Sequence, residues 1–253
     1  MRPDERQSVG DARVPRKTAR RGGSEGFRPA ELLLFLLATL AVAIFCVCAG
    51  SVRLPELNLT VEKARRIQKI FITACGTAGH AGMVGKVLIE KIARIPVEVD
   101  IASEFRYRDP IVDENSVVLA ISQSGETADT LAAMEEARQK GAVVWSIVNA
   151  IGTQAMRLAD GFISMQSGPE IGVASTKAFT APLVDLYMLA VLLADLRGVL
   201  DAQTRRAYVA DLALIPDLAG RCLDREEQVL NVADVLKNRR DCLYLGRGIN
   251  MPI

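Results

Sequence analysis

Ser122-Gln-Ser-Gly-Glu-Thr127 follows the continuous apolar run Val117-Val-Leu-Ala-Ile121 and precedes an amphipathic segment that extends to Lys140. A strand, a hydroxyl-rich loop and a helix start form an anion site in α/β proteins, because the first N–H groups of a helix have no intrahelical acceptor and the helix dipole is positive there. The stretch contains no Lys or Arg, so it is not a P-loop. It predicts a site for a phosphate carried by a small metabolite rather than by ATP with magnesium.

The segments around this loop alternate short apolar runs with helical patterns. We expect strands at 70–74, 96–101, 117–121, 142–148, 161–165 and 242–246. We expect helices at 78–94, from Glu126 or Thr127 to Lys140, at 153–158, at 175–196 and at 202–238, the last interrupted at Pro216. Strands spaced about 20–25 residues apart with helices between them predict the α/β class, with a doubly wound parallel sheet flanked by helices.

The first fifty residues differ in character from the rest. Residues 1–29 are rich in Arg, Gly, Ser and Pro and are expected to form a disordered basic tail. Residues 32–52 carry no charge over 21 positions, and a helix of about 20 residues spans a bilayer core. We therefore predict an apolar helix at 30–51. It could be a membrane anchor, a signal peptide, or a segment joined to an unrelated domain by a gene-model or fusion error.

A second long apolar segment lies at 178–196. Lys177, Asp185 and Asp195 bracket or interrupt it. Charged side chains at these positions favour a buried helix of the α/β core over a membrane span.

Composition narrows the range of partners and cofactors. The formal net charge of +1 argues against nucleic acid as the main partner. The five cysteines form no CxxC pair and there is one histidine, so no metal site and no cofactor are expected. Scattered cysteines in an odd number fit a reducing compartment.

Two further loops should meet the Ser122 loop at the carboxyl edge of the sheet, where ligands bind in such folds. One is Cys75-Gly-Thr-Ala-Gly79, and the other is 168–177, where Ser175 or Thr176 could cap the long helix. Glycines at every third position from Gly76 to Gly85 do not form the GxGxxG pattern. A dinucleotide site is therefore a weak alternative.

Four motifs in order resemble the first sugar isomerase (SIS) domain of the glutamine–fructose-6-phosphate aminotransferases, the glucosamine-6-phosphate synthases. They are Cys75-Gly-Thr77, Ser103-Glu-Phe-Arg-Tyr107, Ser122-Gln-Ser-Gly-Glu-Thr-Ala-Asp-Thr130 and Glu170-Ile-Gly-Val-Ala-Ser-Thr-Lys-Ala-Phe-Thr180. The resemblance places this domain at 52–238. Gly246-Arg-Gly248 resembles the opening of the second SIS domain, so 239–253 is expected to be its truncated start.

The resemblance implies a fructose 6-phosphate site. It assigns the phosphate to Ser122, Gln123, Ser124 and Thr127, and the sugar to Thr77, Val173 and Ser175. Many members carry Ser at the position of Ala78, so this chain lacks one hydroxyl. Glu126 is expected to be a structural residue at the helix start rather than a base.

The chain departs from the family in ways that affect its chemistry. Nothing in residues 1–51 resembles the family's glutaminase domain, and the resemblance stops at the opening of the second SIS domain, so we expect that domain and the family's catalytic residues to be missing. We therefore expect no catalytic residue here, and binding without turnover. Partners would be a sugar phosphate and either a second copy or a missing second SIS domain, with a possible membrane through 32–52. The family implies a cytoplasmic location, and a membrane-tethered sugar-phosphate-binding module is the alternative.

Overall fold

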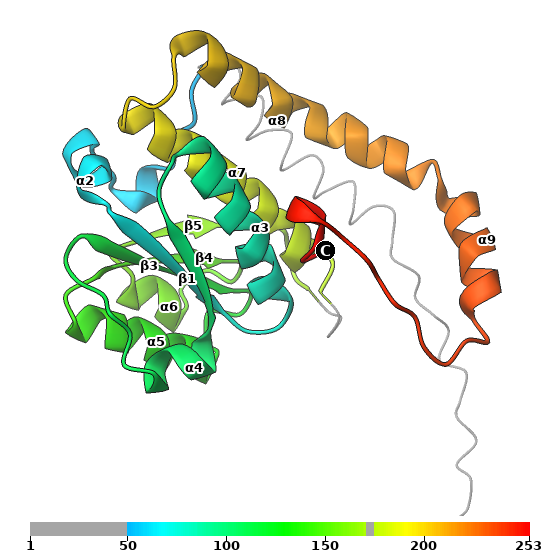
Figure 1. Ribbon diagram of the computed structural model, residues 1–253, viewed down its shortest axis with the longest axis horizontal. Helices are drawn as coiled ribbons and strands as arrows, with labels where there is room; N and C mark the ends of the chain where they lie inside the picture. Colours follow the sequence, from blue (N-terminus) through cyan, green and yellow to red (C-terminus); the bar gives the residue numbers. More distant parts are fainter. Residues whose placement is uncertain (1–49, 171–174) are drawn as a thin grey trace, which may run out of the picture.

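The structure, a computed structural model, describes residues 50–170 and 175–253 (Figure 1). The predictions for the tail at 1–29 and for nearly all of the apolar helix at 30–51 lie outside these residues. Val52, the last residue of the uncharged run, is buried in the core of the α/β domain. The chain is therefore already part of the folded domain at this point.

Five parallel strands form one sheet in the order β2-β1-β3-β4-β5. They are β1 (Lys69–Ala74), β2 (Val97–Ile101), β3 (Ser116–Ser122), β4 (Val143–Val148) and β5 (Gly161–Ser164). All seven residues of β3 are buried, as expected for a central strand covered on both faces. The chain order reverses between β1 and β3, which makes their carboxyl ends the topological switch point.

Helices cover both faces of the sheet, so the predicted doubly wound α/β fold is confirmed (Figure 1). One face carries α2 (Val61–Arg66), α3 (Thr77–Ile92) and α7 (Lys177–Leu196). The other face carries α4 (Ala102–Tyr107), α5 (Ala128–Gln139) and α6 (Gln154–Leu158). Each face has its own cluster of buried apolar side chains, one around Ile72 and Leu189 and one around Phe71 and Met134.

Helix α7 is the core helix that the sequence predicts. Among residues 50–170 and 175–253 it is the one helix long and apolar enough to cross a membrane, and 61% of its apolar window is buried inside the fold. Asp185 lies in the middle of α7 and is buried. Burial raises the pKa of this carboxyl well above its usual value, because a charged carboxylate is poorly solvated there.

Glycines at a spacing of three let α3 approach its neighbours closely. A Cβ at Gly82 would lie 2.8 Å from Cγ2 of Ile72 on β1, and a Cβ at Gly85 would lie 2.8 Å from both Cδ atoms of Leu186 on α7. Both glycines are buried. These two glycines therefore have a packing role on the inner face of a helix.

Two predictions near the C-terminus are wrong. Residues 242–246 form no strand; Leu243, Tyr244 and Leu245 are 84–88% exposed, and an apolar run becomes a strand only where a sheet edge pairs with it. The predicted interruption at Pro216 is also absent, because α8 (Ala202–Leu223) continues through it. A proline removes one backbone bond from the ladder, and a 22-residue helix retains enough others to continue.

Helix α8 and helix α9 (Glu226–Leu236) form an arm that extends away from the sheet (Figure 1). Only Val209 and Leu212 of α8 are buried, and α9 has no buried residue. The chain then returns toward α3, where the short helix η2 (Gly248–Asn250) contacts it. The arm thus exposes apolar side chains in this structure, including Leu218, Val229 and Val232.

Candidate functional site

The loops that follow β1 and β3 meet at the switch point. Ala74, the last residue of β1, pairs with Ile121 in β3. Helix α3 begins at Thr77, just after the first loop, and α5 begins at Ala128, just after the second. Two helix N-termini with their free N–H groups are therefore directed at the same edge of the sheet, as the sequence predicts.

Hydroxyl groups hold the loop Ser122–Thr127 in a closed turn. The N–H of Gly125 donates to Oγ of Ser122 at 3.0 Å, and the N–H of Glu126 donates to Oγ of Ser124 at 3.2 Å. The Thr127 hydroxyl lies 3.4 Å from that of Ser122 and 3.5 Å from that of Ser124. Three hydroxyls therefore converge, and their short side chains leave space above the loop for an anion.

Gly125 is required by the shape of this turn. Its φ of +65° lies in the left-handed region. A Cβ at this position would lie 2.3 Å from Oγ1 and 2.7 Å from Cβ of Thr153. Glu126 links the same two segments, since its Oε1 accepts a hydrogen bond of 2.8 Å from the N–H of Gln154 at the start of α6. Glu126 thus makes a structural contact, as expected.

Glu170, rather than Ser175 or Thr176, satisfies the N-terminus of α7. Thr176 occupies the N-cap position but its side chain makes no capping hydrogen bond. Oε2 of Glu170 accepts from the N–H groups of Thr176 at 3.0 Å and Ala178 at 3.1 Å. The predicted capping role is therefore wrong, because an upstream carboxylate takes the donors. Ser175 instead lines the cavity at the carboxyl edge of the sheet.

These loops enclose a cavity of about 280 Å³, which we call the switch-point pocket. It is lined by Cys75, Gly76, Thr77, Ala78, Ile121, Ser122, Gln123, Ser124, Thr127, Thr130, Ser175 and Ala178. Six of the seven predicted site residues, all except Val173, are among them. Val173 lies outside the described residues. The structure thus brings together side chains from three loops that are far apart in the sequence.

Thr130 also lines the pocket, although sequence reasoning missed it. It lies in the first turn of α5, three residues after Thr127, and is buried. Residues three apart share a helix face, so the threonine spacing in Thr127-Ala-Asp-Thr130 was the available signal. Of the described residues that line this pocket, none is a histidine, lysine, arginine or carboxylate. Any positive potential there comes from the helix N-termini and backbone N–H groups.

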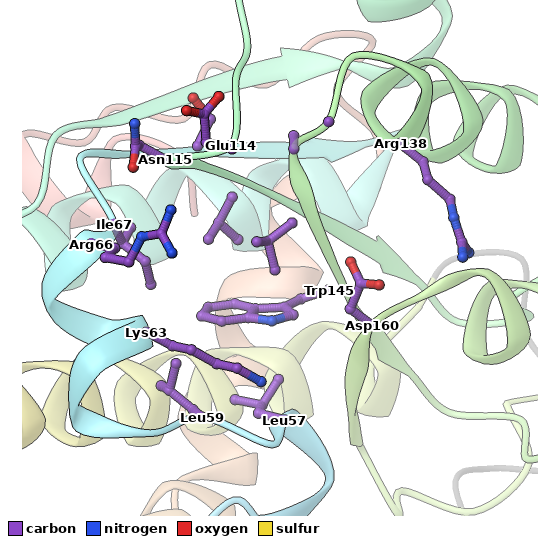
Figure 2. A pocket seen from close by; sticks show the side chains of 15 residues that line it. Leu57, Leu59, Lys63, Arg66, Ile67, Glu114, Asn115, Arg138, Trp145 and Asp160 are labelled. Carbon is purple, nitrogen blue, oxygen red and sulfur yellow. The ribbon is translucent and has the colours of Figure 1, made fainter.

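A second cavity, of about 540 Å³, lies at the opposite edge of the sheet (Figure 2). It is larger than the switch-point pocket, but it contains none of the predicted site residues. Strand β3 runs from one cavity to the other, with Val117 at one end and Ser122 at the other. We assign the predicted anion site to the smaller cavity, because the hydroxyl-rich loop and the helix N-termini lie there.

Fold and site together define a doubly wound α/β domain with an uncharged, hydroxyl-lined pocket at its switch point. The model of the SIS domain family matches residues 64–192, and the chain belongs to this family. The glutamine–fructose-6-phosphate aminotransferase (isomerizing) of Clostridium tetani is 46% identical over 202 residues, which cover 80% of this chain and 33% of that protein. The enzyme of the same name from Caldanaerobacter subterraneus is 47% identical over 200 residues, 79% of this chain and 33% of that protein.

A solved structure agrees with these relatives. The C-terminal domain of glucosamine-fructose-6-phosphate aminotransferase from Francisella tularensis superposes with a TM-score of 0.80 at 33% identity, covering 91% of this chain and 65% of that one. The resemblance to the aminotransferase family is therefore confirmed. The chain spans about a third of the length of the curated relatives it matches.

Proposed function

We propose that this chain binds fructose 6-phosphate in the switch-point pocket, as a sugar-phosphate-binding SIS domain of a glutamine-dependent glucosamine-6-phosphate synthase. The observation that carries the proposal is the convergence of hydroxyl and amide side chains from three loops on one uncharged cavity beside two helix N-termini. The cavity volume of about 280 Å³ is near the lower end of the usual range for small-molecule sites, about 300–1,000 Å³. A ligand the size of a sugar phosphate matches such a volume.

Within this proposal, the three loops have different tasks. The loop Ser122–Thr127 receives the phosphate through the hydroxyls of Ser122, Ser124 and Thr127, together with Gln123. Thr77 and Ser175 face the sugar from the other two loops, and Val173 belongs to the same set. Helix dipoles favour a phosphate at this edge, which explains how an anion could be held without a cationic side chain.

We further propose that the chain binds this ligand without converting it. Moving a proton between carbon atoms of a sugar requires a positioned acid or base. The described lining of the pocket offers hydroxyls, an amide and the Cys75 thiol, but no imidazole, ammonium or carboxylate. The lining therefore supports recognition better than catalysis.

Ser124→Ala is expected to weaken fructose 6-phosphate binding by about 1–3 kcal/mol, because the phosphate would lose one hydroxyl donor. Titration calorimetry on the full chain measures this change. Ser103→Ala is the matched control, since the Ser103 hydroxyl is outside the pocket and donates a hydrogen bond to the exposed Glu104 side chain.

Two outcomes would contradict the proposal. An unchanged dissociation constant in Ser124→Ala would remove this hydroxyl from the phosphate site. Steady formation of glucosamine 6-phosphate by the purified chain, supplied with fructose 6-phosphate and an ammonia source, would disprove binding without turnover.

The exposed apolar face of the arm (Ala202–Leu236) supports a proposal about partners. Val229 and Val232 of α9 are 63% and 58% exposed and lie three residues apart on one helix face. An exposed apolar surface of this kind usually meets another protein surface. We propose that a second copy of this chain, or a second SIS domain, covers it.

Replacing Val229 and Val232 by Glu is expected to convert a dimer of this chain into a monomer, as measured by light scattering. Glu227→Lys, on the opposite side of the same helix, is the control, because it changes the net charge by the same amount outside the apolar face. A wild-type chain that is monomeric at high concentration would rule out the second copy as the partner.

We place the protein in the cytoplasm, in keeping with the proposed sugar-phosphate ligand. The alternative of a membrane-tethered module rests on the run 32–52, of which only the last three residues are described. No observation on the described residues favours this alternative.

A further inference from the structure

The cavity at the amino edge of the sheet is enclosed by segments that come together only in the folded chain. We call it the amino-edge cavity. It is lined by Leu57, Leu59, Lys63, Arg66, Ile67, Glu114, Asn115, Ser116, Val117, Arg138, Gly141, Ala142, Val143, Trp145 and Asp160. Its volume of about 540 Å³ lies well within the usual range for small-molecule sites, about 300–1,000 Å³.

Trp145 forms part of the inner wall of this cavity. Its side chain extends from β4, and the residue is 2% exposed. Figure 2 shows the indole in the middle of the cavity, with aliphatic side chains such as Leu57 and Leu59 beside it. Because the indole is almost completely covered, the apolar surface that the cavity offers to a planar ring comes from the partly exposed Leu59 and Val143.

The indole N–H is a donor without an acceptor. Within 50–170 and 175–253, no group accepts a hydrogen bond from Nε1 of Trp145. This nitrogen is also not among the fully enclosed unpaired atoms, and it lies on the ring edge toward Lys63 (Figure 2). Because a tryptophan N–H in a protein interior usually finds a partner, the cavity offers a place for an acceptor.

Cationic side chains in the cavity lining outnumber the carboxylates by one. Lys63 extends from α2 into the cavity and uses one N–H on the carbonyl of Asn58 at 3.1 Å, which leaves two protons. Arg66 at the end of α2 has no ion-pair or hydrogen-bond partner among the described residues. On the acidic side, Asp160 already accepts from the N–H of Val144 at 2.8 Å. With Arg138, three cationic side chains line the cavity against the two carboxylates of Asp160 and Glu114.

We propose that the amino-edge cavity is a second binding site, for a small planar organic anion. The ring would lie against Leu59 and Val143, and the anionic oxygens would accept from the indole N–H, Lys63 and Arg66. Charge-assisted hydrogen bonds of this kind are about twice as strong as neutral ones, which favours an anion over a neutral ligand of the same shape. This site is separate from the switch-point pocket, since the two cavities share no lining residue.

The single tryptophan of the chain makes the proposal directly measurable. A ¹H–¹⁵N spectrum of the full chain contains one indole N–H signal, and it belongs to Trp145. Benzoate is the probe, and benzamide is its neutral counterpart with the same ring. At low ionic strength, benzoate is expected to shift the indole signal in a saturable way, with an affinity about tenfold higher than that of benzamide.

Two variants of α2 test the role of the rim charge. Arg66 lines the cavity, whereas its neighbour Arg65 does not, and both are exposed. Arg66→Glu is expected to weaken benzoate binding about tenfold or more, while Arg65→Glu, with the same change in charge, leaves it close to that of the wild type. The free energy of unfolding should be unchanged in both, which shows that the fold is intact.

Three results would overturn the proposal. These are an indole signal that does not respond to benzoate, equal affinities for benzoate and benzamide, and equal losses in Arg66→Glu and Arg65→Glu. Loss of the benzoate response in Ser124→Ala would also overturn it, because the probe would then occupy the switch-point pocket. None of these results bears on fructose 6-phosphate binding, so the two proposals fail independently.

Discussion

Gly125→Ala is expected to abolish measurable fructose 6-phosphate binding and to lower the free energy of unfolding by about 2–4 kcal/mol. The new Cβ would lie 2.3 Å from Oγ1 and 2.7 Å from Cβ of Thr153, distances that force one segment to move. The φ of +65° adds strain for any residue with a Cβ. A displaced loop would also lose the hydrogen bond from the Gly125 N–H to Ser122, and with it the convergence of hydroxyls.

Gly198→Ala is the control for Gly125→Ala, because it introduces backbone strain at a positive φ without steric overlap. Gly198 follows α7, has a φ of +72°, and a Cβ there would meet no atom within 4 Å. This control is expected to cost only about 1 kcal/mol and to leave ligand affinity unchanged. Denaturant unfolding and titration calorimetry give the two quantities. If Gly125→Ala bound fructose 6-phosphate as the wild type does, the loop Ser122–Thr127 would not be the phosphate site.

The sequence predicts the sheet well because buried parallel strands appear as continuous apolar runs. Strand β3 illustrates this, since the predicted 117–121 becomes Ser116–Ser122 with every residue buried. Strands, loops and helices alternate along the chain. In a parallel sheet, this order places the loop that follows each strand at the carboxyl edge. For that reason, residues as distant as Thr77 and Ser175 could be predicted to lie near one another.

Other features depend on contacts that no local pattern reveals. The helix α4 has six residues, too few for a helical period to be recognised. The choice of Glu170 over Ser175 or Thr176 at the start of α7 depends on how the intervening loop folds back. The glycines of α3 appeared as a possible ligand motif, and only the contacts of Gly82 and Gly85 with Ile72 and Leu186 show their packing role.

The amino-edge cavity could not be predicted for a related reason. Its charged and aromatic members come from α2, from the loop before β3, from the end of α5, from β4 and from the residue before β5. No two of these segments form a recognisable motif together. A ligand site made in this way is visible only after tertiary packing, whereas the Ser122 loop carries its chemistry within six residues.

Gly161→Ala is expected to disrupt the amino-edge cavity and to lower the free energy of unfolding by about 1–3 kcal/mol. A Cβ on Gly161, the first residue of β5, would lie 2.7 Å from Cα of Leu57 and 2.9 Å from the carbonyl oxygens of Glu56 and Leu57. These are backbone atoms of the short helix η1 (Pro55–Leu57), so no rotamer change can relieve the overlap. The segment that carries Leu57 and Leu59 must then move away from the sheet.

Because this segment is one wall of the cavity, Gly161→Ala should shift the indole N–H signal of Trp145 and weaken benzoate binding, while fructose 6-phosphate affinity remains that of the wild type. Gly220→Ala is the control, since Gly220 lies within α8 and a Cβ there meets no atom within 4 Å. Alanine in a helix interior should stabilise that variant by about 0.5–1 kcal/mol. If Gly161→Ala left both stability and the indole signal unchanged, the close contact between η1 and β5 would not shape the cavity, and the wall would have to be held by other residues.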